Sequence, residues 1–127
     1  MEHWANKYVG KPYISKQYDC ASLAVDVLRE VFGKDVPDYG ERPASRSEGH
    51  ADLAQRLEDR TTRIEKPVEG CAVQILVGQR IAHVGVYCEV DGWPCVLHNI
   101  RRHGVILTKL QDMRRHGWIV EGFYEWK

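Results

Sequence analysis

A cysteine at the start of an expected helix is the residue of this sequence best suited to nucleophilic chemistry. Cys20 follows Asp19, and aspartate is a residue type that caps helix N-termini. Backbone N–H groups are unpaired in a first helical turn, and the helix dipole favours negative charge there. A thiol in that position is shifted toward thiolate, the form that attacks carbon. Taken alone, the helical spacing favours the alternative that Cys20 is only the first core residue of an apolar stripe. That stripe continues through Leu23, Ala24, Val27, Leu28 and Val31.

Two of the six histidines lie in apolar, strand-like segments and could serve the thiol. His83 begins the run His83-Val84-Gly85-Val86-Tyr87, and His98 follows Val96-Leu97 in the next expected strand. Adjacent antiparallel strands can bring the two rings together, which gives Cys20 as nucleophile, His83 as base and His98 as the residue that orients His83. Asn99 is the alternative orienting residue, because successive strand residues point to opposite faces and only one of them can face Cys20. The remaining histidines are interpreted as surface residues: His3, His50, His103 and His116.

An acyl-transfer intermediate also needs hydrogen-bond donors for its oxyanion. The backbone N–H of Cys20 is one expected donor, and the hydroxyl of Tyr13 or Tyr18 in the preceding loop is another. A zinc site is not expected, because no Cys-x-x-Cys pair is present. We expect no cofactor. The other cysteines are interpreted as buried apolar thiols rather than zinc ligands: Cys71, Cys88 and Cys95.

Helical patterns precede strand patterns along the chain. We expect a short helix within residues 1–10, a second from Cys20 to about Gly33, and a solvated third helix within residues 45–60. From Cys71 onward the periodicity changes, and β-like runs separated by turn residues predict strands at 72–77, 81–90, 94–100, 105–110 and 118–123, with Asp91-Gly92 as a hairpin turn. This order predicts a single α+β domain over residues 1–127, with N-terminal helices packed on an antiparallel meander.

Composition excludes several classes of partner. The 127 residues carry 18 basic and 18 acidic side chains, so the net charge argues against nucleic-acid or membrane-surface binding. No apolar run is long enough to cross a membrane, and the N-terminus lacks the pattern of a secretory signal peptide. Synthesis in a cytosol is therefore expected.

Taken together, these motifs resemble the NlpC/P60 family of papain-like cysteine peptidases, above all members from phage tail tips. Tyr8-Val9-Gly10-Lys11-Pro12-Tyr13 resembles the family's opening motif, and Asp19-Cys20-Ala21-Ser22-Leu23 resembles its nucleophile motif. The run from His83 to Tyr87 is the most specific match, and Leu97-His98 resembles the third catalytic position. Ala21-Ser22 departs from the Ser-Gly or Trp-Gly of many members, and the glycine-rich segment before the cysteine is absent.

The resemblance implies a papain-like fold, no metal, and cleavage of an amide bond in peptidoglycan peptides, typically between D-glutamate and diaminopimelate. It also implies synthesis in a bacterial cytoplasm, later residence in a phage tail, virion or cell wall, and tail-tip proteins as partners. Two alternatives stay open. One is a tail-assembly or structural protein with little activity, and the other is a papain-like amidase or acyltransferase acting on a different bond.

Overall fold

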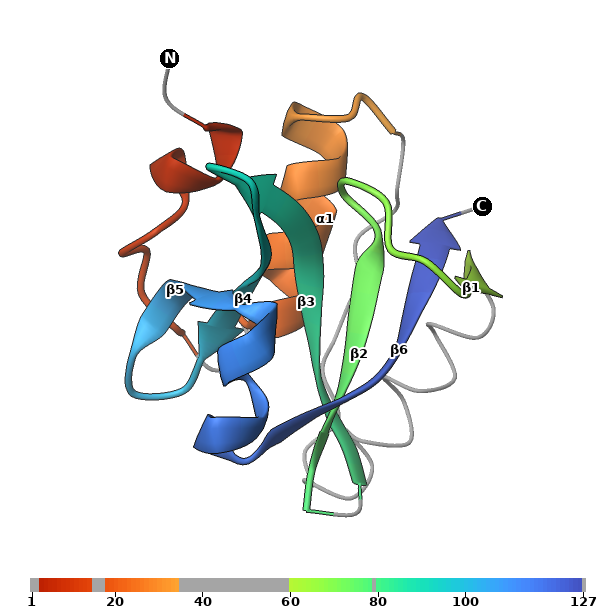
Figure 1. Cartoon of the computed structure of the whole chain (residues 1–127). Helices are drawn as coiled ribbons and strands as arrows, with labels where there is room; N and C mark the ends of the chain where they lie inside the picture. Colours follow the sequence, from red (N-terminus) through yellow and green to blue (C-terminus); the bar gives the residue numbers. More distant parts are fainter. Residues whose placement is uncertain (1–2, 15–17, 35–59, 79, 127) are drawn as a thin grey trace.

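The computed structural model describes residues 3–14, 18–34, 60–78 and 80–126, with the side chains of residues 80–82 left aside. Its centre is an antiparallel six-stranded sheet (Figure 1). The α-helix and the N-terminal 3-10 turn lie on one face, and two further 3-10 turns lie on the other. The strands are β1 (Thr61–Ile64), β2 (Ala72–Val77), β3 (Arg80–Val90), β4 (Trp93–Ile100), β5 (Gly104–Lys109) and β6 (Trp118–Trp126). The helical elements are η1 (Trp4–Lys7), α1 (Cys20–Glu30), η2 (Leu110–Asp112) and η3 (Arg114–His116).

The predicted fold class was wrong. The described residues form a mainly-β fold, not a papain-like α+β fold with several N-terminal helices on a sheet. The first expected helix is only the single 3-10 turn η1, and Gly10 with φ of 95° lies in left-handed backbone soon after it. The polar segment after residue 60, for which no strand was expected, contributes the strand β1, rich in β-branched residues. The helix expected within residues 45–60 lies almost wholly outside the described residues.

The sheet order is β1-β6-β2-β3-β4-β5. Strands β2 to β5 form the expected meander, and Asp91 and Gly92 turn β3 into β4 with positive φ angles of 52° and 81°. The last strand departs from the meander. After η2 and η3 the chain crosses back, so that β6 pairs with β2 on one side and with β1 on the other. The two central strands of the candidate site, β3 and β4, are therefore internal and rigidly paired.

Each face of the sheet carries its own apolar cluster. The first cluster packs Leu23, Ala24, Val27 and Leu28 of α1 against the inward residues of β3 and β4, among them Val86 and Leu97. The second cluster lies on the opposite face, where Met113 and Trp118 cover Ile75 and Val96. Alternation along β3 and β4 therefore decides which side chains face α1 and which face the η2–η3 turns (Figure 1).

Candidate functional site

The N-terminus of α1 begins at Cys20, as predicted, and is held in place by two sets of hydrogen bonds. Asp19 is the N-cap residue, and its Oδ1 accepts a hydrogen bond from the backbone N–H of Ser22 at 3.1 Å. From β4, Asn99 donates through Nδ2 to the backbone carbonyls of Tyr18 at 3.0 Å and Asp19 at 3.4 Å. Asn99 thus fixes the two residues that precede the cysteine.

His83 and His98 meet across β3 and β4, as their strand positions predicted. His83 Nε2 lies 2.8 Å from His98 Nδ1, and His98 Nε2 lies 3.0 Å from Thr108 Oγ1 on β5. His98 is fully buried and His83 is 9 % exposed. Three neighbouring strands therefore hold a buried hydrogen-bonded chain that runs from His83 through His98 to Thr108.

Gly85 makes room for the histidine pair. A Cβ atom at this position would lie 2.5 Å from Val96 Cγ1 and 3.3 Å from His98 Cβ, which is too close for a side chain. Next to His83, the pairing of β3 with β2 shifts register between Ile75 and Leu76, so residue 82 is an extra residue in the strand. Bulges of this kind re-aim the side chains beside them. The glycine and the bulge together explain why the two rings can approach within hydrogen-bond distance.

Burial keeps both imidazoles neutral. Desolvation lowers the pKa of His83 to about 4, and the negative charge of Asp19 opposes part of this shift. The pKa of His98 is lowered as well, first by desolvation and then by the neighbouring His83 and His116. The indole of Trp118 packs edge-on against His98, with ring centroids 4.9 Å apart, and covers the pair from the η3 side. A neutral His83 is the form that can accept a proton.

Cys20 and the histidine pair lie on opposite faces of the sheet. Cys20 packs against the apolar cluster between α1 and the sheet. His83 is paired directly with Ile75 and His98 contacts Trp118, so both histidines lie on the other face. The end of α1 is nevertheless close enough for the charge of Asp19 to act on His83. Any reaction between the thiol and the imidazole must take place at this end of the helix.

The structure divides the tasks expected of His98 and Asn99. The sequence hypothesis assumed that the residue facing Cys20 would also orient His83. Instead His98 contacts His83, while Asn99 points to the α1 side and holds the backbone before Cys20. His98 is therefore the residue positioned to orient His83, and Asn99 positions the helix start.

The two tyrosines proposed as oxyanion donors differ in their surroundings. Burial raises the pKa of the half-buried Tyr13, and Cys20 would raise it further when ionised, so this hydroxyl lies near the thiol. Burial also raises the pKa of Tyr18, and the next contribution comes from Asp26. Since Asp26 lies more than a turn along α1 from Cys20, the Tyr18 hydroxyl is directed away from the thiol. Tyr13 is the better candidate donor.

The other cysteines lie away from this site. No disulfide joins any of the four, and Cys71, Cys88 and Cys95 are buried. Desolvation raises the pKa of all three thiols, as expected for apolar core residues. Within the described ranges no group of three or more His, Cys, Asp or Glu residues could hold a metal ion. Nor is any helix among these residues long and apolar enough to cross a membrane.

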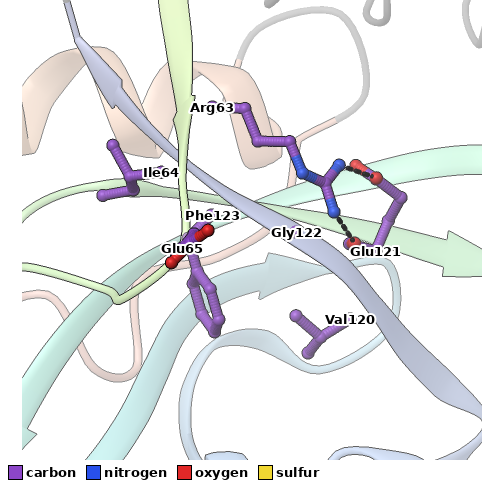
Figure 2. A pocket seen from close by; sticks show the side chains of 7 residues that line it. All are labelled: Arg63, Ile64, Glu65, Val120, Glu121, Gly122 and Phe123. Atoms are coloured by element: carbon purple, nitrogen blue, oxygen red, sulfur yellow. Dashed lines mark hydrogen bonds and ion pairs between the residues drawn. The ribbon is translucent and has the colours of Figure 1, made fainter.

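A shallow hollow of about 500 Å³ lies at the other end of the sheet, between β1 and β6 (Figure 2). The guanidinium of Arg63, which lines this hollow, donates hydrogen bonds to the side chain and backbone carbonyl of Glu121 and to the Tyr124 hydroxyl. Val120 and Phe123 contribute apolar lining (Figure 2). None of the residues expected to carry chemistry lines this hollow.

Thr108 and Trp118 belong to the site but were not predicted from the sequence. Thr108 lies in an expected strand, and a hydroxyl among apolar neighbours was its only signal. Trp118 reaches His98 only because β6 returns beside β2, which no local pattern encodes. The contact of Trp118 therefore depends on a strand order that could not be predicted, whereas the contact of Thr108 lies within the expected meander.

Acidification is expected to destabilise the protein through the buried histidines. The pKa of His83 in the folded protein, about 4, lies below the ordinary value of about 6.5, so the unfolded chain takes up the proton first. Its stabilising contribution is present above about pH 6.5 and is lost as the pH falls toward 4. From pH 7 to pH 5 we expect the free energy of unfolding to drop by about 2 kcal/mol from this group.

Urea unfolding of the wild type at pH 7 and pH 5 measures this loss, with His83→Gln and the exposed control His103→Gln measured in parallel. The loss should shrink in His83→Gln and persist in His103→Gln. Equal losses in all three proteins would show that His83 is not the group being titrated.

No protein-family model matches this chain, and no curated protein is significantly similar to it. Membership of the NlpC/P60 family therefore stays a prediction from the motifs around Cys20, His83 and His98.

Proposed function

We propose that the protein is a cysteine hydrolase that cleaves amide bonds in bacterial peptidoglycan peptides. The observation that carries the proposal is the buried chain from His83 to Thr108, beside a helix end that begins with Cys20. A nucleophile, a base and a residue that orients the base are the parts that covalent acyl transfer requires. The proposal rests on these residues and not on a papain-like fold.

The mechanism uses the second ring nitrogen of His83. Its Nε2 is engaged with His98, so Nδ1 is the nitrogen that takes the thiol proton of Cys20. The sulfur then bonds to the substrate carbonyl carbon, and the oxyanion accepts hydrogen bonds from the Cys20 backbone N–H and from Tyr13. When the intermediate collapses, the C–N bond breaks and His83 returns its proton to the leaving amine. Water next attacks the thioester, with His83 as base, and releases the acid and the thiol.

The substrate class comes from the motif resemblance. The order of the Cys20, His83 and His98 motifs supports a peptide of the bacterial cell wall, with the D-glutamyl-diaminopimelate amide as the first bond to test. The same resemblance supports a role in a phage or prophage tail, with tail-tip proteins as partners. In that role the protein is made in the bacterial cytoplasm and then carried to the virion or the cell wall.

A structural role is the second candidate function, and a specific observation favours it. His98 is fully buried, both of its ring nitrogens have partners, and the pair lies on the sheet face opposite Cys20. Buried polar groups satisfied in this way can also serve simply to define a core. A tail-assembly protein without hydrolase activity would fit such a pair.

Hydrolysis of purified muropeptides, with products identified by mass spectrometry, separates the two candidates. The wild type and the control Cys71→Ala are expected to release the same cleavage products, while Cys20→Ala should release none. Cys71 is a suitable control because it is a buried thiol that directly precedes β2, away from His83. Absence of product from all three proteins would favour the structural role, and cleavage by Cys20→Ala would exclude this thiol as nucleophile.

A further inference from the structure

Thr108 occupies the far end of the hydrogen-bonded chain and has no equivalent among the residues singled out from the sequence. It lies on β5 directly opposite Val96, so it is the diagonal neighbour of His98 on the same face of the sheet. It is 8 % exposed, and its Oγ1 lies 3.0 Å from His98 Nε2. The hydroxyl therefore touches the only ring nitrogen of His98 that His83 does not.

Two proton arrangements fit these distances when both histidines are neutral. In the first, His98 carries its proton on Nε2 and donates to Thr108, so its Nδ1 accepts from His83 Nε2–H. His83 Nδ1 then has a lone pair for the thiol proton. In the second, Thr108 donates to His98, His98 donates to His83, and the proton of His83 sits on Nδ1. Only the first arrangement leaves His83 competent as a base.

We propose that Thr108 is a positioning residue that accepts a hydrogen bond from His98 Nε2–H and thereby holds His83 in its base-competent tautomer. This inference rests on the proposed hydrolase function and deepens it. Thr108 touches neither the substrate nor the thiol, so it acts only through His98. A hydroxyl suits the role because it can accept from His98 while its own hydrogen rotates elsewhere.

The surroundings of the pair limit what else could set the tautomer. Among the described residues, the charged or titratable groups that act on the pair from outside are Asp19, from the α1 end toward His83, and His116, from η3 toward His98. His116 reaches His98 only across Trp118, on which it stacks with ring centroids 5.0 Å apart. Thr108 is thus the partner in direct hydrogen-bond contact with His98 on the side away from His83.

The first test observes the tautomer itself in the folded wild type, with ¹⁵N-labelled histidine and two-bond ring correlations in NMR. We expect protonated Nε2 and lone-pair Nδ1 on both His83 and His98 at pH 7. A proton on Nδ1 of His98 in the wild type would overturn the proposed role of Thr108. It would not bear on Cys20 as nucleophile, which the Cys20→Ala variant tests separately.

The second test compares Thr108→Val, which keeps the shape, with Thr108→Ser, which keeps the hydroxyl. In muropeptide hydrolysis, the kcat of Thr108→Val should be lower than that of the wild type by about tenfold or more, with little change in KM. The kcat of Thr108→Ser should stay within a few-fold of the wild-type value. The pH profile of kcat should shift in Thr108→Val alone. If both variants keep wild-type turnover, Thr108 does not position His98. If the wild type itself is inactive, the proposed function fails instead.

Discussion

Replacing His83 with alanine is expected to reduce muropeptide turnover by about a hundredfold to ten-thousandfold, the usual contribution of a positioned general base. The reason is that the thiol of Cys20 would lose its proton acceptor, while the start of α1 would keep its cap from Asp19 and its anchor from Asn99. Binding of the peptide should change little, so the effect should appear in kcat rather than in KM. Initial rates across a range of substrate concentrations measure the two constants separately.

His103→Ala is the matched control for this prediction. His103 is an exposed histidine in the turn between β4 and β5. Its replacement by alanine therefore removes the same type of side chain from the surface. Turnover by His103→Ala should match that of the wild type. A folded His83→Ala protein with wild-type kcat would remove His83 from the mechanism, whereas a drop in both variants would indicate a general loss of structure.

Gly85→Ala is expected to have the largest effect on stability. The added Cβ would lie 2.5 Å from Val96 Cγ1 and 3.2 Å from the Leu97 carbonyl, in the interior of the sheet. Overpacking of this kind typically costs about 1–3 kcal/mol, and relief would require β3 and β4 to move apart. Such a movement would also separate His83 from His98, so hydrolysis should fall further than the loss of folded protein explains. Urea unfolding and turnover per folded molecule measure the two effects.

A rescue variant makes the prediction on Gly85 specific. Val96→Ala removes the Cγ1 atom with which the new Cβ would collide. The double variant should therefore be less destabilised than the sum of the two single variants. Strict additivity would mean that the contact with Val96 does not explain the need for glycine at this position.

The parts of the fold that local patterns encode could be predicted from the sequence. A capping aspartate and an apolar stripe placed the start of α1 at Cys20, and β-like runs between turn residues placed the strands of the meander within a residue or two. The Asp91-Gly92 turn then set β3 beside β4, which is why the meeting of His83 and His98 could be foreseen.

The parts that depend on long-range pairing could not be predicted. β1 is a short, polar strand of four residues that pairs with β6, and β6 reaches β2 by crossing the sheet rather than by a hairpin. The fold class was wrong because helical periodicity near the N-terminus was taken to mean several packed helices, whereas the described residues contain only α1. Local patterns likewise could not show that α1 and the histidine pair occupy opposite faces.

Because Cys20 and the histidine pair lie on different faces, the proposed mechanism depends above all on whether the Cys20 thiol comes into contact with the His83 ring. Alkylation of Cys20 by limiting iodoacetamide, mapped by peptide mass spectrometry between pH 5 and pH 8, tests that contact without any assumption about the substrate. We expect the wild-type thiol to react at neutral pH much faster than the same thiol in His83→Ala, because His83 takes up its proton. Identical rates and identical pH profiles for Cys20 in the two proteins would contradict the account.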